Sequence, residues 1–181
     1  MTARLLSIGT SVPPARLRQA EIRDLFASQP GLDRLTTRLI SAAFDSSAIE
    51  TRHSVIAGAS GFSPVFVDED DGLRSPTTGE RNAIYRREAP QLSAAAATDA
   101  IARSGHEAGD ITHVITASCT GFFAPGPDYL LVRDLGIRRT AERYHIGFMG
   151  CAAAFPELRA AARICEARPG AVIPVVRTAL C

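Results

Sequence analysis

Excess charge of one sign, long apolar runs and paired cysteines are all missing from this chain. Its 20 Lys and Arg residues are balanced by 19 Asp and Glu residues, so the net charge of +1 offers no broad basic surface for nucleic acid. The first apolar run, residues 5–8, is too short for the core of a signal peptide, and no later run approaches the length of a membrane span. We therefore expect a cytoplasmic protein that binds neither nucleic acid nor membranes.

The cysteines also lack the spacing of a metal or disulfide framework. Cys119, Cys151, Cys165 and Cys181 form no C-x-x-C pair and have no zinc-like spacing to the histidines. We expect no bound metal, and free thiols fit a reducing compartment.

Composition and pattern predict a single globular α/β domain over residues 1–181. Hydrophobic residues make up 46% and charged residues 22% of the chain, which is typical of globular proteins. We predict strands at 4–9, 51–57, 110–119, 142–148 and 171–176, an exposed loop at 58–80, and helices at 19–28, 34–44, 81–105, 128–136 and 151–167. Pro90 is expected to interrupt or kink the third helix. Alternation of strands and helices favours a largely parallel sheet.

Two of the predicted helices are rich in alanine. The runs are residues 94–97 in one helix and residues 152–154 and 160–162 in the other. Small side chains allow close approach to a neighbouring backbone, as in a helix buried between two sheets. High helix propensity alone explains the same composition, so both interpretations stay open.

Cys151 follows Gly150 at the predicted start of the last helix. Unpaired N–H groups and the helix dipole favour a thiolate there, and the same N–H groups suit an oxyanion formed when a thiolate attacks a carbonyl. Residues 151, 155, 158, 162 and 165 also share one helical stripe, which we expect to face the core. Local chemistry thus leaves Cys151 open as a nucleophile or a core residue, whereas Cys165 is expected to be buried.

A cysteine nucleophile usually needs a histidine partner. His145 lies only six positions before Cys151. Side chains alternate along a strand, which puts His145 on the face opposite Tyr144 and Ile146, so we expect a half-exposed strand residue rather than a catalytic partner. The local sequence pattern does not locate any other histidine beside Cys151.

Four ordered segments carry a family resemblance: "IGTSVPPARLRQAEI", "SSAIETRH", "ASCTGFFAPGPDYLLVRDLG" and "GFMGCAAAFPELRAA". Together they resemble the N-terminal portion of type III polyketide synthases, the chalcone-synthase-like branch of the thiolase superfamily. The resemblance covers nearly the whole chain. It implies the N-terminal half of an αβαβα layered, thiolase-like fold with buried Ala-rich helices.

The resemblance also implies an activity. Cys151 would take a starter acyl group from acyl-CoA as a thioester, and condensation with malonyl-CoA would give a polyketide of the alkylresorcinol, pyrone or naphthol type, with no bound cofactor. Arg52 matches the family arginine that meets coenzyme A phosphates. Cys119 and Thr120 match the acyl pocket, and Ala124 matches a loop position that reaches across the interface of a homodimer.

The chain departs from the family near its end. The family's catalytic His and Asn lie in a C-terminal half, and this sequence ends at Cys181 before either. Pro174 interrupts the last predicted strand, and Arg177 and Ala179 replace a small residue and a Glu. We expect the isolated chain to be catalytically impaired and, because apolar faces would stay uncovered, prone to aggregate.

Two alternative functions stay open, one enzymatic and one non-catalytic. One is another ketoacyl synthase of the thiolase superfamily, which would share the strand, cysteine and helix arrangement. The other is a non-catalytic fragment or pseudoenzyme that pairs with a full-length synthase through the family's dimer surface.

Overall fold

The structure, a computed structural model, describes residues 3–58 and 61–180. The chain forms two compact units. The two-helix unit comprises the described part of residues 12–81, and the sheet unit comprises residues 3–11 and 82–180. No helix in the described ranges is both long and apolar enough to cross a membrane.

The two-helix unit is built on a pair of short antiparallel strands, β1 (Arg16–Arg18) and β2 (Thr51–His53). Helices α1 (Gln19–Ala27) and α2 (Arg34–Ser46) lie between these strands in the chain and pack together, with 5.7 Å between the ring centroids of Phe26 and Phe44. The side chain of Asp33 caps α2 by accepting a hydrogen bond of 2.7 Å from the Thr36 N–H. A second antiparallel pair consists of β3 (Ala57–Gly58) and β4 (Gly61–Phe62).

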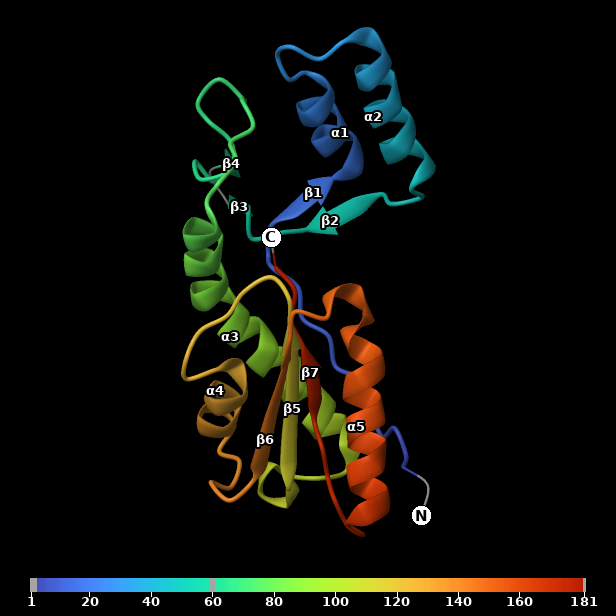
Figure 1. Cartoon of the computed structure of the whole chain (residues 1–181), viewed down its shortest axis with the longest axis vertical. Helices are drawn as coiled ribbons and strands as arrows, with labels where there is room; N and C mark the ends of the chain where they lie inside the picture. The colour runs from blue at the N-terminus through green and yellow to red at the C-terminus, as the bar shows by residue number, and fades with distance from the viewer. Residues whose placement is uncertain (1–2, 59–60, 181) are drawn as a thin grey trace. The chain divides into compact units, whose positions relative to one another are not determined.

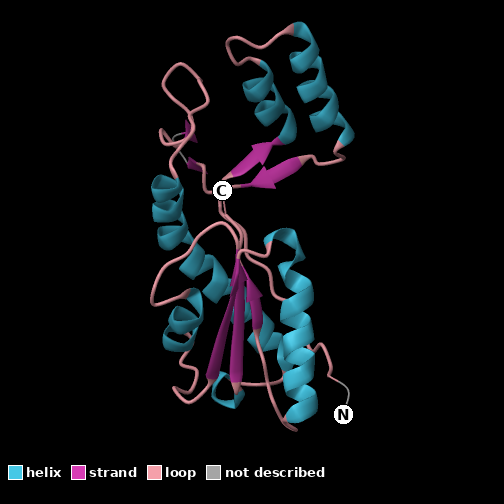
Figure 2. Ribbon diagram, viewed as in Figure 1, coloured by secondary structure: helices cyan, strands magenta, loops and turns pink. Residues whose placement is uncertain are grey.

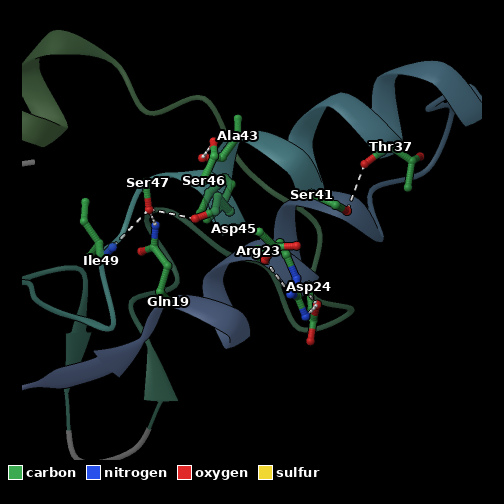
Figure 3. Close-up of polar contacts among 11 residues, drawn as sticks. Gln19, Arg23, Asp24, Thr37, Ser41, Ala43, Asp45, Ser46, Ser47 and Ile49 are labelled. Carbon is green, nitrogen blue, oxygen red and sulfur yellow. Dashed lines mark hydrogen bonds and ion pairs between the residues drawn. The ribbon is translucent and has the colours of Figure 1, made fainter.

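Polar contacts join the two helices to each other and to the segment that directly follows α2 (Figure 3). Gln19 is buried, and its Nε2 donates to the Ser47 Oγ at 3.1 Å. That hydroxyl in turn donates to the Phe44 carbonyl at 2.7 Å. Arg23 pairs with Asp45 across the two helices at 2.8 Å.

The sheet unit contains three parallel strands in the order β6-β5-β7 (Figures 1 and 2). The strands are β5 (His113–Ser118), β6 (Glu142–Gly147) and β7 (Val175–Arg177). The register sets Ile115 of β5 beside Tyr144 on one side and Val175 on the other. Every residue of β5 is buried, as expected for the central strand of a parallel sheet covered on both faces.

Helices α3 (Thr78–Ser104), α4 (Pro127–Asp134) and α5 (Ala154–Ala167) surround this sheet, with 3₁₀ turns η1 (Ala108–Asp110) and η2 (Gly150–Ala153) between elements. In the view of Figure 1, α3 passes behind the strands. A core cluster joins Ala97 of α3, Val114 of β5, Leu131 of α4 and Val176 of β7. Ala97 and, in part, Ala94 of this run pack against the core, whereas Ala95 is exposed, so only one side of the run is buried.

Most predicted elements are confirmed, and so is the parallel α/β sheet. Helices α3 and α4 are followed by Gly105 and Gly136, whose φ values of +80° and +67° are the left-handed conformation that ends a helix. Pro90 lies inside α3 without ending it. The loop prediction for residues 58–80 was too broad, because β4 lies within it and α3 already begins at Thr78.

The strand predicted at residues 4–9 is wrong. These residues form no strand, and Leu5 and Ile8 expose 74% and 63% of their surface. The segment lies along α3, where the Ser7 Oγ donates to the Ala100 carbonyl at 2.7 Å. A strand needs another strand edge for its ladder, and a helix offers none.

Two other strand predictions were too long. The segment 51–57 divides into β2 and β3, because residues 54–56 pair with no strand. In the segment 171–176, β7 begins only at Val175, since Pro174 has no N–H to donate to a ladder.

The orientation predicted for the last helix is also wrong. The first three positions of the expected core stripe face outward: Cys151 is exposed, and Phe155 and Leu158 expose 72% and 54% of their surface. The last two, Ala162 and Cys165, are half-buried. Ala153 and Glu157 are buried instead, each with 2% exposed. Both faces of the amphipathic pattern carry small or apolar residues, so local periodicity did not decide which one the sheet would cover.

Candidate active site

Cys151 lies at a sharp turn between β6 and α5. We call residues 148–151 the nucleophile turn. Phe148 and Gly150 both adopt left-handed backbone, with φ of 59° and 56°. For Gly150 this conformation costs little, whereas for Phe148 it is strained. Strained backbone of this kind gathers at functional sites, so the turn is the first candidate for a site in the sheet unit.

The turn presents the Cys151 thiol to solvent. Cys151 is exposed on η2, one residue after Gly150 and just before α5 begins. N–H groups in a first helical turn lack intrahelical partners, and the positive end of the dipole favours an anion there. Cys165, in contrast, is half-buried, with its Sγ 3.9 Å from the Ala171 carbonyl oxygen.

Arg177, at the end of β7, binds the nucleophile turn directly. Its Nη1 donates to the Cys151 carbonyl and its Nη2 to the Gly150 carbonyl, each at 3.0 Å. One guanidinium therefore holds two consecutive carbonyls of the turn. The sequence marked Arg177 only as a departure from the family, because no local pattern pairs residues 26 positions apart.

A carboxyl group is buried below the turn, in the first turn of α5. Glu157 is 2% exposed, and its Oε1 has no hydrogen-bond partner among the described residues. Burial raises the pKa of the Glu157 carboxyl, while the positive charge of Arg177 acts in the opposite direction. Glu157 was not among the predicted site residues, although an acidic residue between Pro156 and Leu158 on a predicted core helix is unusual.

Cys119 and Thr120 directly follow β5 and lie beside the nucleophile turn. The Phe148 N–H donates to the Ser118 carbonyl at 3.2 Å, which ties the turn to the end of β5. Cys119 is half-buried, and the Thr120 Oγ1 accepts a hydrogen bond of 2.8 Å from the Leu180 N–H. The structure thus brings both predicted pocket residues to the carboxyl end of the sheet, where Cys151 also lies.

Tyr85 of α3 adds a second unexpected group at this end. Its side chain is 1% exposed and its hydroxyl has no partner among the described residues. Burial raises the pKa of the Tyr85 phenol. Gly121 leaves room for the ring, since a Cβ at that position would lie 2.0 Å from the Tyr85 Cγ.

The two other predicted residues lie elsewhere in the chain. Ala124 is exposed in the loop before Gly126, which caps α4. Arg52 belongs to β2 of the two-helix unit, and its Nε donates to the Gln19 Oε1 at 2.8 Å.

Within residues 3–58 and 61–180, no histidine hydrogen-bonds the Cys151 thiol. His145 is exposed and its Nδ1 lies 2.9 Å from the Thr116 Oγ1, while His113 is buried and burial lowers its pKa.

The described residues also contain no group of His, Cys, Asp and Glu able to hold a metal. A separate open hollow of about 450 Å³, lined by His106, Arg138 and Arg168 among others, contains none of the predicted site residues.

Comparison with known proteins shows to which family the chain belongs. Residues 1–180 match the model of "Chalcone and stilbene synthases, N-terminal domain". The chain belongs to this family. A 3,5-dihydroxyphenylacetyl-CoA synthase of Streptomyces toyocaensis is 30% identical over 98% of this chain and 42% of its own length. Bisdemethoxycurcumin synthase of Oryza sativa subsp. japonica is 33% identical over 98% of this chain and 44% of its own length.

A solved structure shares the fold of this chalcone and stilbene synthase family member. The C-terminal type III polyketide synthase domain of Steely1, a type I/III hybrid from Dictyostelium, superposes with a TM-score of 0.87 and 28% identity, over 100% of this chain and 48% of that one. The predicted thiolase-like α/β fold and the resemblance to type III polyketide synthases are both confirmed. The chain spans less than half the length of each of these relatives.

Proposed function

We propose that this chain provides the acyl-loading nucleophile of a type III polyketide synthase, with Cys151 as the acceptor. The observation that carries the proposal is the exposed thiol of Cys151 on a strained turn at the carboxyl end of a parallel sheet. Family membership supports the general class of polyketide synthase chemistry.

The loading step is a thioester exchange. The Cys151 Sγ, as thiolate, attacks the carbonyl carbon of an acyl-CoA, and the carbonyl π electrons move to oxygen. When the oxyanion collapses, the bond to the coenzyme A sulfur breaks and coenzyme A leaves as a thiolate. Backbone N–H groups of the nucleophile turn suit the charge that develops on oxygen. No bound cofactor is needed for this step.

Other predicted residues receive roles in the same proposal. Arg52 would meet coenzyme A phosphates through the Nη edge of its guanidinium, since its Nε already binds Gln19. Cys119 and Thr120 would line the acyl pocket, and exposed Ala124 would lie at the interface of a homodimer. Extension of the loaded starter with malonyl-CoA, in the cytoplasm, completes the proposed activity.

Intact mass measurement tests the loading step. We expect incubation with hexanoyl-CoA to add one hexanoyl group to the parent chain and none to Cys151→Ala. Cys165→Ala is the matched control and should be acylated like the parent, because Cys165 lies half-buried away from the turn. Equal acylation of Cys151→Ala, or an unmodified parent chain, would contradict the proposal.

A second candidate is an interaction module without catalysis, which pairs with a full-length synthase. The observation in its favour is the apolar outer side of α5, where Phe155 and Leu158 are exposed. This candidate predicts co-purification with a full-length homologue that survives Cys151→Ala. Loss of pairing in Phe155→Ser, together with no acyl adduct on the parent, would favour it over the first.

A further inference from the structure

We propose that Arg177 is a positioning residue for the Cys151 nucleophile: its guanidinium holds the two peptide planes of the nucleophile turn that aim backbone N–H groups at the developing oxyanion. The inference rests on the proposed function of Cys151 as acyl acceptor, and it assigns a role to a residue where this chain departs from the family pattern.

The Arg177 guanidinium fixes the direction of two backbone N–H groups. The two 3.0 Å hydrogen bonds from Arg177 reach the carbonyls of Gly150 and Cys151. In a planar trans peptide the C=O and the following N–H point in opposite directions. Fixing these two carbonyls toward Arg177 therefore fixes the N–H groups of Cys151 and Ala152 away from it. A guanidinium fork suits paired acceptors, whereas a single ammonium does not reproduce that geometry.

Arg177 belongs to β7, on the other side of the sheet from the strand that leads into the nucleophile turn. β7 and β6 flank β5 on opposite sides, and the nucleophile turn follows β6. The Arg177 side chain thus links the end of β7 to the turn that follows β6, across the central strand β5. Its backbone is anchored, because Ala117 of β5 pairs with Arg177 in the ladder and accepts from the Thr178 N–H at 3.1 Å. The Thr178 hydroxyl contacts the Ser93 hydroxyl at 2.5 Å in the buried core.

The nucleophile turn contains strained backbone that other contacts must hold in place. Phe148 is in left-handed backbone. Its side chain meets the Phe122 ring, with 6.1 Å between the ring centroids, but it is 78% exposed, so burial does little to enforce that conformation. The tie from the Phe148 N–H to Ser118 holds one end of the turn, and Arg177 holds the other. The positive charge of the same guanidinium also lowers the pKa of the buried Glu157 carboxyl, against the effect of burial.

Two reactions of the same thiol separate positioning from general damage. Acyl transfer to Cys151 passes through an oxyanion, whereas alkylation by iodoacetamide does not. We expect Arg177→Ala to lower the maximal rate of acylation about tenfold or more, with the half-saturating acyl-CoA concentration unchanged, and to alter the alkylation rate less than about threefold. Arg177→Lys should recover part of the loss, and so should ethylguanidinium added to Arg177→Ala.

Arg163→Ala is the matched control, because Arg163 is an exposed arginine of α5 that pairs with Glu166 rather than with the turn. It should acylate at the parent rate. Amide hydrogen exchange over residues 148–153 should speed up in Arg177→Ala and stay unchanged in Arg163→Ala.

A second acyl donor keeps this inference separate from the proposed function. p-Nitrophenyl hexanoate acylates an accessible thiol without coenzyme A recognition. Acylation of the parent by this ester but not by hexanoyl-CoA would count against the proposed function alone, while Arg177 would still be tested with the ester. An unchanged rate of ester acylation in Arg177→Ala, or an equal fall in acylation and alkylation, would overturn the role of Arg177.

Discussion

At the scale of single residues, Glu157 is the most unusual member of the sheet unit. Its carboxyl group is buried on the covered side of α5, and the Oε1 atom has no hydrogen-bond partner among the described residues. Burial disfavours the charged form, and this is why the pKa of the carboxyl is raised. The fold therefore binds the Glu157 proton more tightly than the unfolded chain does.

The stability of the chain should depend on pH through this residue. Because the folded pKa of Glu157 is raised, its favourable contribution is fully present below the ordinary carboxyl pKa and is lost as the pH rises through the folded pKa. Each unit of difference corresponds to about 1.4 kcal/mol. Glu157→Gln should thus raise the urea midpoint at pH 7.5 and leave it near the parent value at pH 4.

The control for this experiment is Glu166→Gln, an exposed position on the same helix. It should have little effect at either pH. A urea midpoint for Glu157→Gln that equals the parent value at pH 7.5 would show that the buried carboxyl does not govern this dependence.

At the scale of elements, the contact between the N-terminal segment and α3 replaces the strand that the apolar pattern predicted. Gly9 lies so close to α3 that a Cβ there would be 2.1 Å from the Ala96 carbonyl oxygen and 2.7 Å from the Ala100 nitrogen. Backbone atoms in a helix cannot move away easily. The small residues of α3 and the missing side chain of Gly9 together make this contact feasible.

Gly9→Ala should therefore detach residues 3–10 from α3. We expect a loss of about 1–3 kcal/mol in the free energy of unfolding, as for overpacking in a core. Faster amide exchange in residues 3–10 would locate the change. Gly109→Ala serves as control, since nothing lies within 4 Å of a Cβ at that position. Identical unfolding of the two variants would rule out the close contact.

At the scale of the whole molecule, apolar exposure and low net charge act together. Phe155 and Leu158 are one turn apart on the outer side of α5, and both are more than half exposed. A net charge of +1 provides little electrostatic repulsion between copies. Self-association at moderate concentration is the expected consequence.

The double variant Phe155→Ser with Leu158→Ser should lower this self-association. Static light scattering against concentration gives the measurement, and the weight-average mass should fall toward that of one chain. Arg163→Ser, an exposed substitution on the same helix, should leave the association unchanged. Equal scattering by the parent and the double variant would mean that α5 does not drive the association.

The sequence by itself determined the order of the helices and strands from α3 to β7, the parallel α/β class and the position of Cys151 between a strand and a helix. Glycine at helix ends, proline at breaks and β-branched runs act locally, so the ends of α3 and α4 and the place of β5 were predictable. The ordered motifs likewise identified the family. None of these features requires knowledge of what packs against the segment.

Only the tertiary structure decided which side of each element is covered. The outward stripe of α5, the helix-bound segment before Gly9 and the burial of Glu157 all depend on the neighbours that the fold supplies. The hydrogen bonds from Arg177 to Gly150 and Cys151 join residues far apart in the chain, and they form because parallel strands end at the same edge of the sheet. Periodicity encodes a helix or a strand, whereas the partner of its surface is a property of the whole fold.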